Sequence, residues 1–266
     1  MSFYNLDATD STGKTLLMIH AMNGLYHRMR NYVHRCTNIN HADDDGYTAL
    51  HYSARVSDPT TMEMLISHGA DIRAVGKDGR TILHFAATTG NARGLQIMVG
   101  SAPYLIDVRD EAGNTPLHTA IEHGYTDAAA ILLGCGADVN IPDTNGCFPI
   151  FTAVMGGDMV IITMLLKTAD LHTRNTHGSS VLHYAILTTP DILELLLDYG
   201  ADINAADNNG DTVLHRAAFW SLDIIPSLLD YGADPLAVNK HGRLPHMLCK
   251  DAGLKEYMLE RSMSGN

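Results

Sequence analysis

Basic side chains, aromatic residues and long apolar runs are all scarce in this chain of 266 residues. Lysine and arginine together number 18 against 30 aspartates and glutamates, and the formal net charge is −12. Because nucleic acids and anionic lipid surfaces attract lysine and arginine, this balance predicts neither of them as a partner. The sequence contains no run of 18 apolar residues, so it predicts no membrane-spanning helix.

Paired cysteines are also missing. Cys36, Cys135, Cys147 and Cys249 are far apart in the sequence and form no Cys-x-x-Cys pair. This spacing disfavours a zinc site and a disulfide framework, and it favours a reducing cytoplasmic or nuclear location. The N-terminus has no basic segment followed by an apolar core, so we expect no secretory signal.

Signatures of catalysis are absent as well. The sequence has neither a Gly-x-Ser-x-Gly motif nor a His-Glu-x-x-His motif. Aspartates are plentiful, but most occur in recurrent turn sequences such as "GADI" and "GADVN", where they bond backbone groups or cap helices. We therefore expect a protein that is not an enzyme and that has no catalytic residue, no cofactor and no metal.

One stretch near the start, "DATDSTGKT", resembles a phosphate-binding loop because it ends in Gly13-Lys14-Thr15. In such a loop the glycine-rich turn follows a buried strand and opens a helix, so that backbone N–H groups converge on the phosphates. Only "MSFYNL" precedes this stretch, and it lacks the continuous apolar run of a central strand. Nucleotide binding through Gly13-Lys14-Thr15 is thus a remote alternative.

The most informative feature of the sequence is an internal repeat. Segments similar to "GYTALHYSA" begin at six glycines, spaced by 33, 34, 33, 32 and 32 residues: Gly46, Gly79, Gly113, Gly146, Gly178 and Gly210. Extending the same period reaches Gly13 and Gly242. Gly13-Lys14-Thr15 is therefore in register with the repeat turns, and its lysine occupies a position that varies between copies.

Eight repeats of this length form a single predicted domain over residues 1–266. Their approximate boundaries are 10–42, 43–75, 76–109, 110–142, 143–174, 175–206, 207–238 and 239–266. The first copy has Met18 where the others have histidine, and the last has "LPHM" followed by a charged tail. End units of repeat arrays need polar outer faces, so we interpret these two copies as caps.

A second signature closes the repeats, as in "MLISHGADI", "ILLGCGADVN" and "LLLDYGADIN". Together with the Gly-x-Thr-Pro-Leu-His-x-Ala pattern of residues 113–120, it resembles the ankyrin repeat over about residues 10 to 260. The resemblance implies an all-α repeat solenoid of about eight stacked helix-turn-helix units with β-hairpin-like turns. One helix pair cannot bury its own apolar face, so the units must stack.

The repeat at 110–142 shows why these residue types recur. Gly113 suits a turn with positive φ, the Thr115 hydroxyl can cap the first helix, and Pro116 fits the first turn of that helix. A second helix follows, and we expect it to end at Gly136 in a left-handed cap. The repeat at 143–174 departs most from this pattern, because Phe148 replaces the threonine and Phe151 the histidine. Two interpretations of this repeat stay open. The repeat is locally loose or bent, or its sequence has drifted and the packing of the phenylalanine rings compensates for the change.

The sequence holds 15 histidines, and five of them share one repeat position: His51, His84, His118, His183 and His215. A metal site would require ligands that converge on one point, whereas these residues recur once per repeat. The resemblance implies a structural role, in which each histidine bonds within and between turns.

Arrays of this kind bind partners on a concave face made by the hairpin tips and the first helices. Positions that vary on this face give the predicted partner-binding residues, which are Tyr47, Arg55, Arg80, Glu122, His123, Asp211, Phe219 and Trp220. Trp220 is the only tryptophan of the chain, and Trp, Tyr and Arg dominate binding hot spots. Two interpretations of Phe219 and Trp220 remain open, because large aromatic rings act as binding anchors or pack on a neighbouring repeat.

The leading hypothesis is a monomeric protein-binding scaffold or adaptor in the cytoplasm or nucleus, which acts as a regulator or inhibitor in signalling or transcription. The net charge of −12 favours a basic surface on the partner protein. The resemblance also offers an alternative. Ankyrin sequences that contain "GADVN" or "GADIN" resemble substrates of an asparaginyl hydroxylase, and Asn140 and Asn204 are the matching asparagines.

Overall fold

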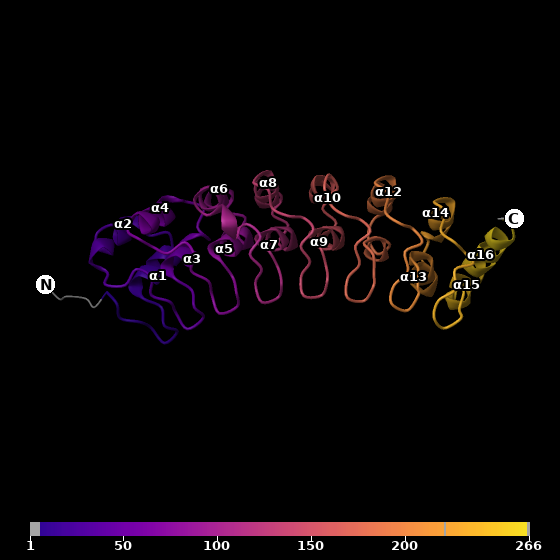
Figure 1. Cartoon of the computed structure of the whole chain (residues 1–266), viewed down its shortest axis with the longest axis horizontal. Helices are drawn as coiled ribbons and strands as arrows, with labels where there is room; N and C mark the ends of the chain where they lie inside the picture. The colour runs from indigo at the N-terminus through magenta and orange to yellow at the C-terminus, as the bar shows by residue number, and fades with distance from the viewer. Residues whose placement is uncertain (1–5, 221, 265–266) are drawn as a thin grey trace. The chain divides into compact units, whose positions relative to one another are not determined.

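Helix pairs joined by hairpin-like turns make up the structure, a computed structural model that describes residues 6–220 and 222–264 (Figure 1). The chain divides into an N-terminal half, Met1–Thr144, and a C-terminal half, Asn145–Asn266. The division falls just before Gly146, where the motif of the most divergent repeat begins. Within each half the helix pairs stack in sequence order, whereas the single domain over 1–266 stays a prediction.

In the N-terminal half, the first helices of successive repeats pack against one another, and each also packs on the second helix of its own repeat. The first helices are α1 (Leu16–Met22), α3 (Ala49–Ser53), α5 (Ile82–Thr88) and α7 (Pro116–Glu122). The second helices are α2 (Tyr26–Met29), α4 (Thr60–Ser67), α6 (Ala92–Ser101) and α8 (Thr126–Gly134). Short 3-10 helices, Val33–Arg35 and Pro103–Leu105, follow α2 and α6.

The C-terminal half repeats this arrangement. Its first helices are α9 (Pro149–Gly156), α11 (Leu182–Ala185), α13 (Val213–Trp220) and α15 (Pro245–Leu248). Its second helices are α10 (Met159–Leu165), α12 (Pro190–Asp198), α14 (Ile225–Asp230) and the longer α16 (Ala252–Ser264). Because each pair leaves an apolar face for the next one, leucine, isoleucine and alanine side chains fill the interior of both halves.

Backbone hydrogen bonds join the turns of neighbouring repeats. We call the eight glycines that begin the repeat motif the hairpin glycines: Gly13, Gly46, Gly79, Gly113, Gly146, Gly178, Gly210 and Gly242. From the second repeat on, the backbone N–H two positions before the hairpin glycine donates to a carbonyl of the preceding repeat, one position before the hairpin glycine of that repeat. Examples are Lys77 to Asp45 (2.8 Å) and Asn208 to His177 (2.9 Å). Antiparallel β-bridges also close three turns: Thr9 with Thr15, Val75 with Thr81 and Ala206 with Thr212. The repeats are therefore joined at their turns as well as through their helices.

The hairpin glycines are required by both backbone geometry and space. All eight have φ between 70° and 86°, a left-handed conformation that favours glycine. In most of them a side chain would also strike the next turn: a Cβ atom on Gly113 would lie 2.6 Å from the backbone nitrogen of Thr144. The predicted positive φ of Gly113 is confirmed at 81°, and Gly136, which follows α8, has a φ of 91°.

A buried threonine, or Ser180 in the sixth repeat, and a buried histidine tie each regular turn to its first helix. Thr81 is the N-cap of α5, and its backbone N–H donates to Nδ1 of His84 (3.1 Å). Because Nδ1 accepts this bond, the proton of the neutral ring is on Nε2. Nε2 then donates to the carbonyl of Asn114 in the next repeat (2.9 Å). One side chain therefore connects a turn, a helix and the neighbouring repeat.

The same histidine bond recurs in the C-terminal half. Nε2 of His183 donates to the carbonyl of Asp211, and Nε2 of His215 to that of Arg243, both at 3.0 Å. All five histidines of this register are buried. Burial lowers the pKa of His51 and His84 from the usual 6.5 to about 4, and it also lowers the pKa of His183. His51, His84 and His183 are therefore neutral at pH 7.

Two repeats replace the histidine with another buried side chain. In the first repeat, Sδ of Met18 accepts the N–H of the cap residue Thr15 (3.4 Å). In the fifth repeat, Phe148 occupies the cap position and the ring of Phe151 is fully buried. The Phe151 ring lies 5.7 Å from the ring of Tyr184 in the next repeat, at an angle of 74°. Aromatic packing thus takes the place of the histidine contact.

Gly13-Lys14-Thr15 forms a repeat turn. Gly13 has a φ of 77°, and Thr15 caps α1. Nζ of Lys14 lies 3.3 Å from Oδ2 of Asp43, a buried carboxylate of the next repeat. The lysine that would hold a phosphate therefore pairs with a carboxylate, and the structure gives nucleotide binding no support.

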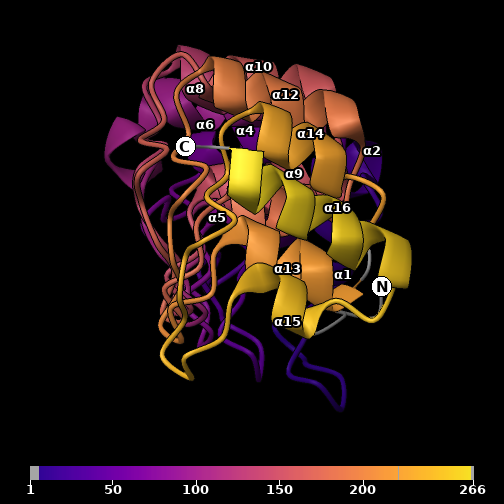
Figure 2. The ribbon, with the colours of Figure 1, turned by 90° about the vertical axis from the view of Figure 1, so that its right-hand side faces the viewer.

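The last repeat differs from the others in its second helix. Figure 2 shows α16 beside α14 and α15 at the end of the C-terminal half. Met258 is buried under this helix, and Arg261 pairs with Asp230 at the end of α14 (2.6 Å). Most other described side chains of α16 are exposed, which agrees with the polar outer face of a cap.

Replacing Gly113 with alanine is expected to destabilise the protein more than replacing Gly136. Both alanines would carry the strain of positive φ, about 1 kcal/mol or more. Only Gly113→Ala also meets the next turn, since no heavy atom of the described residues lies within 4 Å of a Cβ on Gly136. This crowding should cost about 1–3 kcal/mol more. Urea unfolding of the two variants measures the difference, and equal losses would contradict the steric role.

The buried histidines predict a loss of stability below pH 6.5. The unfolded chain takes up protons near pH 6.5, whereas folded His51 and His84 do so only near pH 4. Their contribution to the free energy of unfolding is therefore complete above pH 6.5. It falls by about 1.4 kcal/mol per pH unit and per histidine between those values. Urea unfolding across pH 4–7 measures this slope. His84→Gln should make the slope shallower, and an unchanged slope in this variant would overturn the assignment.

Candidate partner-binding surface

The first helices expose one repeat position at their C-terminal ends, nine residues after the hairpin glycine. In the N-terminal half this position holds residues of mixed character: Met22, Arg55, Thr88 and Glu122. In the C-terminal half it holds Met155, Leu187 and Phe219, which are 57%, 63% and 48% exposed. Trp220 follows at 61% exposure. We call Met155, Leu187, Phe219 and Trp220 the apolar row.

The apolar row runs across three helices that pack in sequence order. Helix α9, which ends at Met155–Gly156, packs on α11, and α11 packs on α13. Packed helices lie about 8–10 Å apart, so the row presents an apolar side chain about every 10 Å across three repeats. Proteins leave contiguous apolar patches exposed chiefly where another molecule covers them.

Phe219 and Trp220 form the end of the row. Their rings meet edge to face, with centroids 5.3 Å apart and an interplanar angle of 87°. Nζ of Lys250 lies 5.7 Å from the centroid of the Phe219 ring, at cation–π distance. The exposures of 48% and 61% favour the anchor interpretation of these two rings over packing on the neighbouring repeat.

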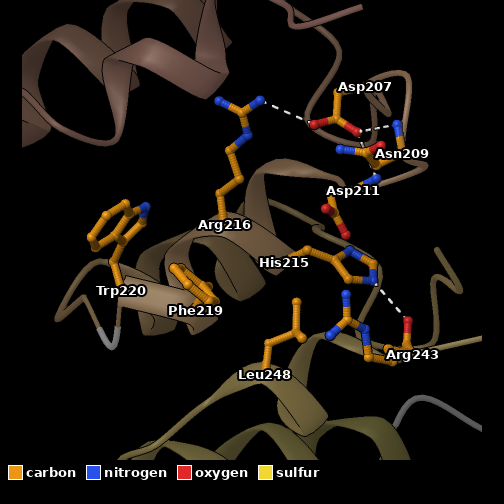
Figure 3. Close-up of a pocket in the computed structure, with 9 residues that line it drawn as sticks. All are labelled: Asp207, Asn209, Asp211, His215, Arg216, Phe219, Trp220, Arg243 and Leu248. Carbon is orange, nitrogen blue, oxygen red and sulfur yellow. Dashed lines mark hydrogen bonds and ion pairs between the residues drawn. The ribbon is translucent and has the colours of Figure 1, made fainter. Parts of the chain in front are cut away.

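A cavity of about 350 Å³ adjoins this aromatic pair (Figure 3). Its lining residues are Asp207, Asn209, Asp211, His215, Arg216, Phe219, Trp220, Arg243 and Leu248. Figure 3 shows Phe219 and Trp220 on one side and the polar groups of the turn on the other. A partner side chain that enters the cavity would therefore meet an apolar wall and a polar wall.

The polar wall of this cavity is held by internal hydrogen bonds. Nη2 of Arg216 lies 3.0 Å from Oδ2 of Asp207 and donates to Oγ of Ser179 (2.8 Å). Burial alone would raise the pKa of Asp207, but hydrogen bonds from Arg216 and from turn N–H groups lower it below its usual value. Oδ1 of Asp211, a predicted site residue, accepts from Nδ2 of Asn239 (2.6 Å). These groups stay fixed in the absence of a partner.

Three other predicted residues come together in the N-terminal half. Tyr47, Arg55 and Arg80 line one cavity of about 240 Å³. Tyr52 and Phe85 complete its walls with Thr88, and the sequence reasoning missed those two rings. Tyr52 and Phe85 occupy the same repeat position, six residues after the hairpin glycine, and this shared register is the signal that could have identified them.

Glu122 and His123 lie apart from both cavities. Both are exposed, as predicted from their register. Nδ1 of His123 lies 2.9 Å from the carbonyl of Thr119, and its ring stacks on Tyr125 at 6.2 Å. Neither residue joins the apolar row, and a role for them in binding stays a prediction.

Asn140 and Asn204, the predicted hydroxylation targets, are exposed. The side chain of Asn204 bridges to the following repeat: Nδ2 donates to the carbonyl of Gly232 (3.2 Å), and Oδ1 accepts from the N–H of Asp234 (2.8 Å). Asn40, in the same register, bridges to its next repeat in the same way. This asparagine thus has a structural role that the sequence reasoning did not assign.

Two further features of the described residues bear on metal binding and membrane insertion. Within residues 6–220 and 222–264, no group of three or more His, Cys, Asp or Glu side chains is placed to hold a metal ion. None of the helices in this part of the chain is both long enough and apolar enough to cross a membrane.

The exposure of Trp220 predicts its fluorescence. As the only tryptophan, it is the sole source of indole emission. A ring with 61% exposure should emit as tryptophan does in water, and acrylamide should quench it strongly in the folded protein. Trp220→Phe, the control, should abolish the signal. Blue-shifted emission protected from acrylamide would instead show that the ring packs on the neighbouring repeat.

Comparison with known proteins places the fold in a family. A family model described as ankyrin repeats (3 copies) matches residues 2–76, 58–143, 133–207 and 150–239. Target of rapamycin complex 2 subunit AVO2 of Saccharomyces cerevisiae is 30% identical over 137 residues, which are 51% of this chain and 32% of that protein. Potassium channel AKT2/3 of Arabidopsis thaliana is 35% identical over 82 residues, 31% of this chain and 10% of the channel. The chain thus matches a third or less of the length of these relatives.

A solved structure matches most of the chain. The ankyrin repeat domain of Bcl-3, described as a unique member of the IkappaB protein family, superposes with a TM-score of 0.70 and 22% identity. The match covers 94% of this chain and all of that domain. It confirms the predicted all-α repeat solenoid, and together with the family match over residues 2–239 it shows that this chain belongs to the ankyrin-repeat family.

Proposed function

We propose that this chain is a protein-binding adaptor that holds its partner on the apolar row. Ankyrin repeats generally mediate binding between proteins, and the chain shares their fold. The observation that carries the proposal is the exposure of Met155, Leu187, Phe219 and Trp220, four large apolar side chains in neighbouring positions of three consecutive repeats.

The energetics of interfaces support this surface. A few residues carry most of the affinity of an interface, and tryptophan is enriched among them. Trp220 and Phe219 offer large apolar areas at the edge of a cavity whose polar wall is already held in place. A partner that covers the row would remove these side chains from water without rearranging the turn. Such preorganisation lowers the cost of binding.

The spacing and charge of the surface suggest the form of the partner. A partner segment that crosses α9, α11 and α13 needs an apolar contact about every 10 Å. Seven residues of an α-helix, or three of an extended strand, span about that distance. The net charge of −12 favours basic residues around those contacts through electrostatic steering.

We further propose a monomer in the cytoplasm or nucleus that acts as a regulator or inhibitor in signalling or transcription. One relative is named as a subunit of the target of rapamycin complex 2, which fits a part in an assembly. Because the chain matches only 32% of that protein, the partner and pathway must be identified by experiment. No catalytic step is proposed, because the fold is that of a binding scaffold.

The proposal is tested by placing a charge in the row. Leu187→Glu and Met155→Glu, each made separately, should weaken capture of the partner about tenfold or more, because a buried carboxylate would replace an apolar contact. The whole chain is immobilised, exposed to cell lysate and compared with each variant by quantitative mass spectrometry. The dissociation constant is then measured with the purified partner.

The matched control is Tyr199→Glu. Tyr199 is 51% exposed, as the row residues are, but it follows the second helix α12. This variant should bind as the unmodified chain does. A partner that tolerates both row variants would move the binding surface elsewhere. Turnover of a substrate without any retained protein would end the adaptor proposal.

A second function, favoured by the exposure of Asn140 and Asn204, is modification by an asparaginyl hydroxylase. The bridging bonds of the Asn204 amide must open, or tolerate an added hydroxyl group, for this to occur. Intact-mass measurement after incubation with such an enzyme tests it. The expected result is one added oxygen per modified asparagine, and an unchanged mass would exclude the function.

A further inference from the structure

The cavity lined by Tyr47, Arg55 and Arg80 lies in the N-terminal half and shares no residue with the apolar row. Its volume of about 240 Å³ is walled by three aromatic rings. The rings of Tyr47 and Phe85 meet at 4.6 Å, and those of Tyr52 and Phe85 at 6.1 Å. The rings brace one another edge to face, so the walls are rigid before any partner arrives.

The two arginines of the cavity have no carboxylate partner within the described residues. The guanidinium of Arg80 lies over the Phe85 ring at 5.8 Å, and its Nη2 donates to Oγ1 of Thr88 (2.8 Å). Nε of Arg80 is buried and makes no hydrogen bond to any described residue. Arg55 is exposed, and among the described ion pairs it takes part in none. Positive charge is therefore present at the cavity without a matching acid.

The nearest carboxylates are already engaged. The hydroxyl of Tyr47 donates to Oδ2 of Asp78, and the hydroxyl of Tyr52 donates to Oδ2 of Asp43. Asp43 also pairs with Lys14. Burial, followed by these hydrogen bonds, raises the pKa of both tyrosines, so their hydroxyls remain neutral donors at pH 7. Asp43 and Asp78 thus face the tyrosines, and Arg55 and Arg80 remain available to a ligand.

We infer that this cavity binds the side-chain carboxylate of an aspartate or glutamate from a protein partner, with Arg55 and Arg80 as its two cationic contacts. Guanidinium groups match the geometry of a carboxylate and form strong charge-assisted hydrogen bonds. Two arginines on the wall repel a cationic side chain. The three aromatic rings of the wall favour a carboxylate that is flanked by apolar groups, since these groups can contact the rings.

This inference gives the N-terminal half a specificity role separate from the apolar row. The net charge of −12 attracts basic surfaces over distances of about 8 Å at physiological salt. The cavity acts at contact distance and selects one acidic side chain on such a surface. A partner with basic residues around a single fixed acid would satisfy both conditions.

The test selects peptides from a random phage-displayed library on the full chain. The selected peptides should share an aspartate or glutamate at one fixed position. Replacing that acid with its amide should raise the dissociation constant of the peptide about tenfold. Arg80→Gln should weaken binding of the acidic peptide to the same extent. It should also remove the difference in affinity between the acid and amide peptides. Arg55→Gln should lower the affinity for the acidic peptide about threefold, as expected for the loss of an exposed ion pair.

Controls separate recognition from folding. Arg93→Gln, on the exposed side of α6, should bind the acidic peptide as the unmodified chain does. Melting temperatures identify any variant that fails to fold. Arg55 has no described ion pair to lose, so Arg55→Glu serves as the second test: it should reject the acidic peptide and accept the version with lysine in place of the acid.

Three outcomes would overturn the inference. The first is a library that yields no binder requiring an acid. The second is equal binding of acid and amide peptides to the unmodified chain. The third is tighter binding of a peptide with phosphoserine at the acidic position, which would assign the cavity to phosphopeptides. None of these results bears on the row variants, so failure here leaves the adaptor proposal standing.

Discussion

A hydrogen bond from a buried histidine to a carbonyl of the following repeat, made by His84, His183 and His215, ties one repeat to the next. Nε2 of His84 reaches the carbonyl of Asn114 only because Nδ1 already accepts the N–H of the cap residue Thr81. The ring must therefore be neutral and hold its proton on Nε2. In the first and fifth repeats, which lack the histidine, other buried groups serve: the Met18 sulfur accepts the cap N–H, and the Phe151 ring packs on Tyr184 of the next repeat. The requirement is a buried connection between turn and helix, which the histidine extends to the neighbouring repeat.

This internal constraint leaves the outer positions free to vary. Threonine and histidine, two and five residues after the hairpin glycine, are buried and fixed by the stack. The position nine residues after the glycine lies at the exposed end of the first helix, and no stacking contact restricts it to one residue type. It is mixed in the N-terminal half and apolar in the C-terminal half, at Met155, Leu187 and Phe219. One fold therefore carries a cavity lined by aromatic rings and two arginines in one half and an exposed apolar row in the other.

The sequence alone predicts the structural features that depend only on the position of a residue within its repeat. The positive φ of Gly113, the cap at Thr115 and the shared burial of the histidines all follow from local turn chemistry and a common period. The gathering of Tyr47, Arg55 and Arg80 in one cavity could not be predicted. Tyr47 and Arg80 share one register position in successive repeats, but Arg55 lies eight residues further along, and the three side chains meet only once the helices stack. The exposure of Trp220 was undecided for the same reason: register assigns it to a face, but the neighbouring repeat decides whether its ring is covered. The bridging role of Asn204 likewise depends on the loop of the next repeat.

The central claim to be tested is that the ends of the first helices in the C-terminal half form the partner interface. Site-specific photo-crosslinking in cells tests this claim most directly. A photoreactive side chain is placed at Leu187, and in a second protein at Tyr199 after α12. The probe at Leu187 should crosslink to one dominant protein, and the probe at Tyr199 should not. Crosslinking of that protein from Tyr199, with none from Leu187, would contradict the claim and assign the interface to the second helices.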